Sequence, residues 1–171
     1  LIYIFIIMES ELVKLQSKEG QILTINKQAA ELSVLIKNNL IDFSIEQAIP
    51  LDEVSEKILE LIIKYLNHYN GTAPAEIEKP LKSNNMKDVV DEFSSGFINE
   101  LELNDLIDLT VAANFMEIQS LLDLCTAKIA SMCKDKSEEE IFKTFGITDQ
   151  FTEEERAKVK EENQWLEDNI N

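Results

Sequence analysis

The sequence has few glycines and a single histidine, and both shortages argue against common kinds of enzyme. Its four glycines are scattered along the chain, so no glycine-rich loop is available to hold a phosphate group. His68, the only histidine, has no serine or cysteine near it in a recognisable nucleophile motif. One histidine and two cysteines cannot complete a four-ligand zinc site. The sequence therefore predicts no catalytic site, no metal and no cofactor.

Positive charge is also scarce. The chain has 33 aspartates and glutamates but 16 lysines and arginines, so its formal net charge is -17. Such a chain repels phosphate backbones and anionic lipid head groups, and we therefore expect neither nucleic acid nor a membrane as a partner. Acidic runs such as Glu153 to Glu155 are typical of solvated helix starts rather than of acid–base pairs. The acidity suits a basic protein partner, although solubility alone also explains it.

Long apolar runs and cysteines that could pair are missing as well. Leu1 to Met8 is apolar but much shorter than the roughly 20 residues of a membrane-spanning helix, and it lacks the features of a signal peptide. We expect residues 1–8 to be a non-native or disordered N-terminal extension.

Cys125 and Cys133 lie in a helical pattern that would hold their Cα atoms about 12 Å apart, which is too far for a disulfide. Both are predicted to be reduced thiols.

Alternation of apolar and polar residues predicts a β-hairpin near the start of the chain. Its strands are expected at 13–16 and 22–25, joined by a turn at 18–21. A further short extended piece is expected at 48–51, because the residue before Pro50 is pushed toward the β region.

Helical periodicity dominates the rest of the chain. Asn26 and Ser33 can cap two short helices, over 28–32 and 34–40. A strong amphipathic helix is expected after Ser55, where apolar residues recur every three or four positions. The same spacing resumes after a long loop and predicts two more helices. The residues that define these three helices are Ile58, Leu61, Ile62, Tyr65, Leu66 and Tyr69, then Leu106, Leu109, Thr110 and Ala113, then Ile118, Leu121, Leu122, Cys125 and Ile129.

The order of these elements predicts an α+β fold. Strands are few and confined to the first third of the chain, which disfavours parallel βαβ winding. Residues 70–87 contain Gly71, Pro74 and Pro80 among mixed charges, so this segment is predicted to be a flexible loop. The expected architecture is a small mixed domain followed by a helical extension.

Two helix starts are encoded near the C-terminus. Ser137 with Glu140, and Thr152 with Glu155, each match the capping box, in which a hydroxyl and a carboxylate satisfy amide donors at a helix start. Short acidic helices cannot bury large apolar side chains by themselves, so either the rest of the domain or a partner must cover them. The apolar residues concerned are Phe145, Ile147 and Phe151.

Several short motifs occur in the order in which one known family has them. Together they resemble the S-phase kinase-associated adaptors, which join cullin to F-box proteins in SCF ubiquitin ligases. The resemblance extends from about Val13 to Trp165, and its C-terminal motifs are the specific ones. The motifs are Val13-Lys14-Leu15-Gln16-Ser17, Ile49-Pro50-Leu51, Ala112-Ala113-Asn114-Phe115, Glu139-Glu140-Ile141, Lys143-Thr144-Phe145, Phe151-Thr152-Glu153-Glu154-Glu155 and Glu161-Glu162-Asn163-Gln164-Trp165.

The resemblance implies a BTB/POZ domain over 9–129 and a helical F-box-binding extension over 130–171. The implied protein is a non-catalytic SCF adaptor of the cytoplasm and nucleus, which bridges a cullin and F-box substrate receptors for ubiquitin-dependent degradation. Its implied cullin contact is Asn114 with Phe115, where the family has tyrosine at the second position. Helical spacing alone would instead make Phe115 a core aromatic. The implied F-box contacts are Ile141, Phe145, Ile147, Phe151, Asn163 and Trp165. The alternative for these residues is that they pack against other helices of the same chain.

The chain also departs from the family pattern. Tyr65 and Val90 stand where family members usually carry tryptophan, and Glu138 replaces a proline that is hydroxylated and glycosylated in some protists. These differences indicate a divergent paralogue. Two alternative functions therefore stay open: an F-box-binding module that no longer engages cullin, and a homodimeric BTB scaffold. A weak homodimer in the absence of partners is also expected to be possible.

Overall fold

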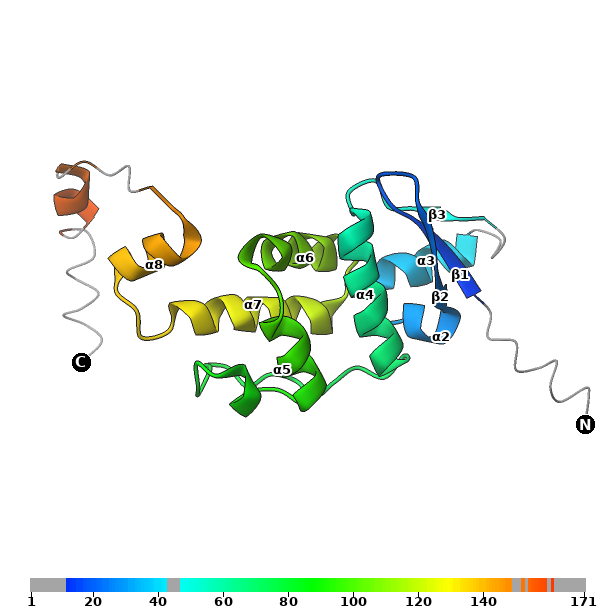
Figure 1. Cartoon of the computed structure of the whole chain (residues 1–171), viewed down its shortest axis with the longest axis horizontal. Coiled ribbons are helices and arrows are strands. Elements are labelled where there is room, and N and C mark those ends of the chain that lie inside the picture. Colours follow the sequence, from blue (N-terminus) through cyan, green and yellow to red (C-terminus); the bar gives the residue numbers. More distant parts are fainter. Residues whose placement is uncertain (1–11, 43–46, 149–151, 153, 160, 162–171) are drawn as a thin grey trace, which may run out of the picture. The chain divides into compact units, whose positions relative to one another are not determined.

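The computed structural model describes residues 12–42, 47–148, 152, 154–159 and 161. The chain forms two compact units, Leu1–Lys134 and Asp135–Asn171, which we call unit 1 and unit 2. Unit 1 holds the β-sheet and most of the helices, and unit 2 is helical (Figure 1). Within the described part of the chain, none of the helices combines the length and the apolar character needed to cross a bilayer.

Three strands form the sheet of unit 1, in the order β2-β1-β3. β1 (Leu12–Gln16) and β2 (Ile22–Asn26) pair in antiparallel fashion, which confirms the predicted hairpin. Alternation along β1 buries Val13 and Leu15 in the core. β3 (Ile49–Pro50) lies parallel to β1, a pairing that the sequence did not indicate. It forms because the helices between the hairpin and β3 carry the chain back to the free edge of β1 (Figure 1).

The two short helices after the hairpin begin at their predicted caps. In α2 (Lys27–Ala30), the Asn26 side chain accepts a hydrogen bond from the amide of Gln28 at 3.0 Å. α3 (Val34–Asp42) follows Ser33 directly. Both caps are therefore confirmed, although α2 ends earlier and α3 later than the sequence predicted.

Ser33 joins the start of α3 to a distant part of unit 1. It is fully buried, and its hydroxyl accepts from the Ile36 amide at 3.2 Å and donates to the Met116 carbonyl at 2.6 Å. Removing the hydroxyl would leave the Ile36 amide and the Met116 carbonyl without this hydrogen-bond partner in the protein interior. We therefore expect Ser33→Ala to lower the free energy of unfolding by about 2 kcal/mol, as measured by urea denaturation.

α4 (Glu56–Tyr69) is the predicted amphipathic helix, and it begins at Ser55 as expected. The Ser55 hydroxyl accepts from the Ile58 amide at 3.4 Å, so Ser55→Ala removes only a helix cap and should cost about 1 kcal/mol. This variant is the control for Ser33→Ala. If the two variants lose the same free energy of unfolding, the hydrogen bond from Ser33 to Met116 contributes nothing to stability.

The buried side chains of α4 are Ile58, Leu59, Ile62, Tyr65 and Leu66.

The segment after α4 is the predicted loop. Residues 70–85 form no helix or strand, and the short helix η1 (Met86–Asp88) and then α5 (Glu92–Asn99) follow. The sequence analysis missed α5, although Asp91 caps it by accepting a hydrogen bond from the Ser94 amide at 2.9 Å. The flexibility of the loop stays a prediction.

Two long helices complete unit 1. α6 (Leu103–Phe115) and α7 (Gln119–Cys133) pack against each other, and both were predicted from their apolar spacing. Both cysteines lie in α7 as free thiols. Cys125 is buried, and this burial raises the pKa of its thiol to about 12, so it stays protonated at neutral pH.

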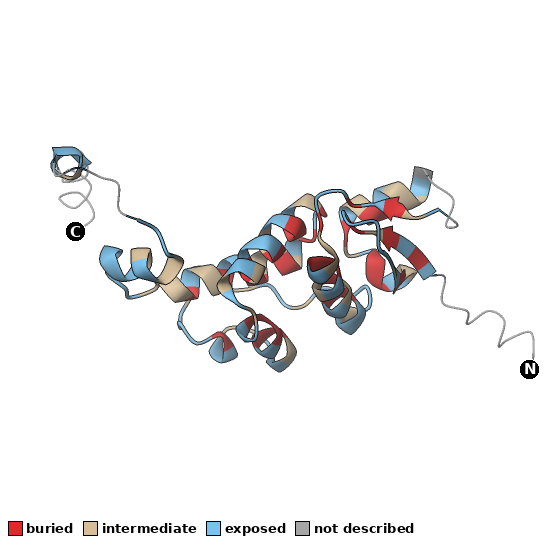
Figure 2. Ribbon diagram, turned by 45° about the horizontal axis from the view of Figure 1, so that its top comes forward, coloured by how far each residue is buried: buried red, intermediate tan, exposed pale blue. Residues whose placement is uncertain are grey.

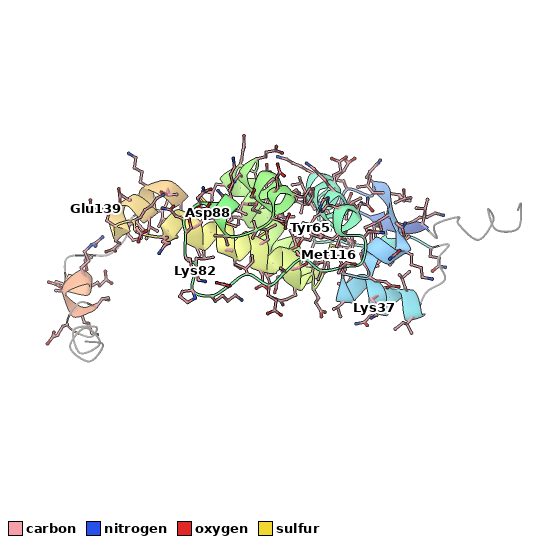
Figure 3. All side chains as sticks on the ribbon, turned by 90° about the horizontal axis from the view of Figure 1, so that it is seen from below. Lys37, Tyr65, Lys82, Asp88, Met116 and Glu139 are labelled. Atoms are coloured by element: carbon pink, nitrogen blue, oxygen red, sulfur yellow. The ribbon has the colours of Figure 1, made fainter. Side chains whose placement is uncertain are left out.

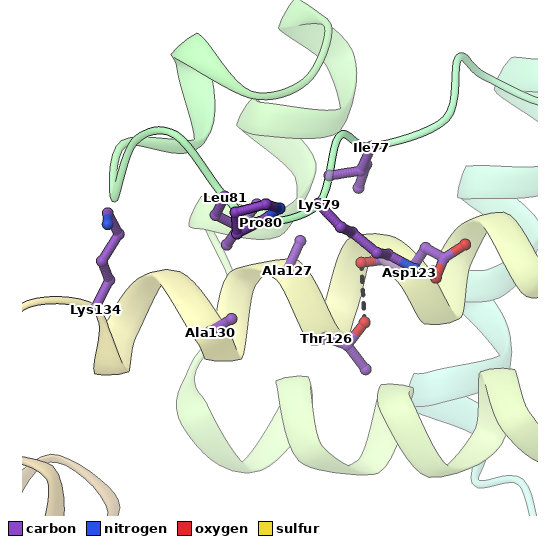
Figure 4. A pocket seen from close by; sticks show the side chains of 9 residues that line it. All are labelled: Ile77, Lys79, Pro80, Leu81, Asp123, Thr126, Ala127, Ala130 and Lys134. Carbon is purple, nitrogen blue, oxygen red and sulfur yellow. Dashed lines mark hydrogen bonds and ion pairs between the residues drawn. The ribbon is translucent and has the colours of Figure 1, made fainter. Parts of the chain in front are cut away.

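The loop runs along one side of α7, and the two border an open hollow of about 480 Å³ (Figure 4). Ile77 and Leu81 of the loop line it together with Ala127 of α7. The ammonium group of Lys79 lies 3.2 Å from Oδ1 of Asp123, which also belongs to α7. The ion pair attaches this part of the loop to the helix, and Ile77 and Leu81 pack against the core of unit 1.

Unit 2 begins with α8 (Glu138–Phe145), and residues 154–159 are also helical. The predicted capping box at Ser137 and Glu140 is complete. At the second start, the Thr152 amide donates to Glu155 Oε2 at 2.9 Å, and the Glu155 amide donates to Thr152 Oγ1 at 3.3 Å. Both predicted helix starts are therefore confirmed.

Candidate functional site

The two residues of the implied cullin contact lie at the end of α6. Asn114 is exposed, whereas Phe115 is half-buried and packs against the core of unit 1. The chain turns sharply just after them, where Glu117 adopts a left-handed backbone with a φ of 52°. Buried Met116 and Ile118 on either side of Glu117 anchor this turn, so the end of α6 is held firmly.

Two further residues of α6 extend this surface, and the sequence analysis did not identify them. Ile107 is 42% exposed and Val111 is 62% exposed, and an exposed apolar patch, more than a single exposed side chain, points to an interaction surface. Their spacing of four residues, continued by the pair at the helix end, places all of them along one side of the helix. We call this set the α6 surface: Ile107, Val111, Asn114 and Phe115.

Acidic residues lie beside the α6 surface. Asp108 is exposed next to Ile107. Asp105, one turn earlier, accepts a hydrogen bond from the ammonium group of Lys57 at 2.6 Å, and this bond raises the pKa of Lys57. The pair joins α4 to α6. An apolar stripe with acidic neighbours is suited to a protein partner with an apolar centre and basic edges.

The described part of the implied F-box contact lies in unit 2. Ile141 and Phe145 are both half-buried and stand four residues apart, so they share one side of α8. Ile147 follows the helix and is 53% exposed. No residue of α8 itself is buried (Figure 2). We call Ile141, Phe145 and Ile147 the α8 surface; the remaining expected contacts, Phe151, Asn163 and Trp165, lie outside the described residues.

The start of α8 is fixed by polar contacts rather than by packing. The Ser137 amide donates to Glu140 Oε2 at 2.9 Å, and the Glu140 amide donates to Ser137 Oγ at 3.3 Å. At the other end, Gly146 has a φ of 63° and its amide donates to the Phe142 carbonyl, a common way to end a helix. These contacts at its two ends support the helical arrangement of the α8 surface.

The capping box makes the start of α8 sensitive to acid. Hydrogen bonds from Ser137 hold the pKa of the Glu140 carboxyl below its ordinary value. Such a group stabilises the fold above its unfolded pKa, and the contribution is lost as the pH falls through the folded pKa. We therefore expect the amide NMR signal of Ser137 to show an acid transition below the ordinary glutamate pKa. Glu140→Gln keeps an acceptor but cannot titrate, so a transition that persists in this variant would contradict the assignment.

His68 lies in the last turn of α4 and is exposed to solvent. Its ring stacks on that of Phe93, with centroids 3.5 Å apart and planes at 4°. Asn70, not His68, caps α4. Among the described residues, no group of three or more histidine, cysteine or acidic side chains is arranged to hold a metal ion.

These features define a class of protein: a small POZ-type domain with apolar residues left exposed on α6, followed by a helical segment with its own apolar surface. Comparison with family models agrees with this class. Residues 11–71 match the Skp1 family tetramerisation domain, and residues 119–166 match the Skp1 family dimerisation domain. The chain belongs to the Skp1 family, and the α+β fold of a POZ domain with a helical extension is confirmed.

Curated relatives match nearly the whole chain. An S-phase kinase-associated protein 1 homolog of Tetrahymena thermophila is 42% identical over 156 residues, which cover 91% of this chain and 94% of the relative. An E3 ubiquitin ligase complex SCF subunit sconC of Arthroderma otae is 37% identical, and the match covers 91% of this chain and 94% of the relative. A protein of the same description from Aspergillus clavatus is 36% identical, and the match covers 93% of this chain and 99% of the relative.

Proposed function

We propose that this protein is a non-catalytic adaptor of an SCF-type E3 ubiquitin ligase. The observation that carries the proposal is its similarity, over about nine tenths of its length, to relatives described as SCF subunits. In this proposal the α6 surface binds a cullin scaffold, and the α8 surface, together with the chain beyond it, binds the F-box of a substrate receptor. The adaptor would act in the cytoplasm and nucleus, which imaging of a fluorescent fusion would test.

The adaptor would work by holding its two partners in a common assembly. Its two surfaces belong to different compact units and share no residue. Neither surface requires a reacting group. With one histidine and no nucleophile motif in the sequence, we propose that the chain contributes binding rather than chemistry to ubiquitin transfer.

Phe115 raises the main alternative, an F-box-binding module that does not engage cullin. The family has tyrosine at this position, so any hydrogen bond that its hydroxyl makes to cullin is lost here. The exposed aliphatic side chains of Ile107 and Val111 favour retained binding, because they provide apolar area on the same side of α6. A cullin contact that depends on this area does not need the hydroxyl.

The proposal is tested by reconstitution from purified components. The full chain is mixed with a cullin N-terminal domain, with an F-box protein, and with both, and the products are separated by size-exclusion chromatography with light scattering. A ternary complex is the expected result. Recovery of the F-box protein alone would favour the module that does not engage cullin. A stable dimer that binds neither partner would favour the homodimeric scaffold.

A further inference from the structure

The second helix of unit 2, at 154–159, is anchored by a polar side chain. None of the residues of unit 2 that the structure describes is buried. Along the second helix every residue is exposed except Arg156, which is half-buried. Within the described part of unit 2, the contact that holds this helix is therefore made by Arg156 rather than by a buried apolar residue.

Arg156 joins the start of the second helix to the start of α8. Its amide donates to the Thr152 carbonyl at 3.0 Å, so Arg156 lies in the first turn of its helix. Its guanidinium Nη1 lies 3.4 Å from Oε1 of Glu138, the first residue of α8. The second helix therefore begins beside the first turn of α8. We call the ion pair between Arg156 and Glu138 the unit 2 clasp.

The charges around the clasp make it more than an isolated surface ion pair. Each of the two helix starts carries three consecutive glutamates, Glu138 to Glu140 and Glu153 to Glu155. Glu139, which is labelled in Figure 3, is exposed in the first turn of α8. Acidic residues suit each helix start separately, but two acidic starts side by side repel each other. Arg156, the only arginine of the chain, places a permanent cation where the two starts meet.

The clasp encloses the whole α8 surface. Its two residues are 18 positions apart in the sequence, and Ile141, Phe145 and Ile147 all lie between them. Joining the two ends of a segment reduces the number of conformations open to it. A surface that is already ordered loses less entropy when its partner binds, and so it binds more tightly.

We propose that Arg156 is a positioning residue for the F-box contact. Through Glu138 it holds the two helices of unit 2 together and so orders the α8 surface before the partner arrives. Arg156 itself does not need to touch the F-box. This inference rests on the proposed function, since it names the group that prepares the F-box surface, but the ion pair can be tested without any partner.

NMR of the free full-length chain tests the ion pair. Because the chain has a single arginine, the side-chain signals of its guanidinium group are those of Arg156. Glu138→Gln removes the charge that Arg156 contacts and should shift these signals. Glu139→Gln removes the same charge one residue along α8, where the side chain points about 100° away, and should shift them less. Equal shifts in the two variants, or none in Glu138→Gln, would overturn the clasp.

Exchange of the two charges tests the positioning role. Arg156→Glu adds a further acid to the two acidic starts and should weaken binding of a purified F-box protein about tenfold in titration calorimetry. Arg156→Glu combined with Glu138→Arg restores an ion pair of opposite direction, and affinity should return to within about threefold of the unmodified chain. Arg156→Lys keeps the cation and should also stay within about threefold.

The outcomes separate the positioning role from its alternatives. If the exchanged pair binds the F-box protein as weakly as Arg156→Glu does, the positioning role is overturned and Arg156 contacts the partner directly. Full affinity in Arg156→Glu would overturn it as well. If the unmodified chain binds no F-box protein, the proposed function fails together with the positioning role, whereas unshifted arginine signals in Glu138→Gln would overturn the clasp alone.

Discussion

Val111→Lys is expected to reduce binding of a cullin N-terminal domain at least about 100-fold, or roughly 3 kcal/mol, while F-box binding is retained. Val111 is the most exposed large aliphatic residue of α6 and lies in the middle of the α6 surface. A partner that covers this stripe would have to remove water from the new ammonium group without supplying a counter-charge. The loss should be seen as a lower affinity in biolayer interferometry with immobilised cullin.

The matched control adds the same charge elsewhere in unit 1. Asn67 is exposed on α4, and Asn67→Lys should leave cullin binding within about twofold of the unmodified protein. Both variants should unfold at nearly the same temperature, since neither position is buried. If Val111→Lys binds cullin with the affinity of the unmodified protein, the α6 surface is not the cullin contact.

Phe145→Ala is expected to weaken F-box binding about 30-fold, or roughly 2 kcal/mol, without changing cullin binding. Phe145 shares one side of α8 with Ile141, and both side chains are only half-buried. Aromatic side chains that keep accessible area on a small helical unit are typical anchors of protein interfaces. Titration calorimetry with a purified F-box protein measures the loss.

Lys143→Ala is the control on the same helix. Lys143 is exposed, so its truncation should change F-box affinity by less than about threefold while keeping α8 intact. Circular dichroism of each variant checks that the helical content is preserved. Equal losses for the two variants would indicate a general effect on α8, and retained affinity in Phe145→Ala would place the F-box contact elsewhere in the chain.

Elements with a strong local signal could be predicted from the sequence. The helix α4 has apolar residues on one side and a serine at its start, and both features act within a few residues of the chain. The same is true of the capping boxes at Ser137 and Thr152. The helix α5 was missed because it is only eight residues long and its polar residues obscure the apolar spacing, although Asp91 offered a cap.

The residues of the two candidate surfaces could be predicted from the sequence only in part. Apolar spacing indicated the inner side of α6, because Leu106, Leu109 and Ala113 are buried as it predicts. Family resemblance indicated Asn114 and Phe115, but only the structure shows that Ile107 and Val111 are also exposed on the outer side. The role of each surface in binding stays a prediction until the variants are measured.

By itself, the sequence determined the acidic character of the protein, its lack of catalytic motifs, most of its helices and their caps, because these depend on composition or on neighbours within one or two turns. Tertiary structure decided what depends on distant segments. It paired β3 with β1 in parallel and joined Ser33 to Met116. It also buried Tyr65 and packed its ring beside that of Tyr69, with centroids 4.8 Å apart. Contacts of this kind leave no local pattern, since packing of the whole unit selects them.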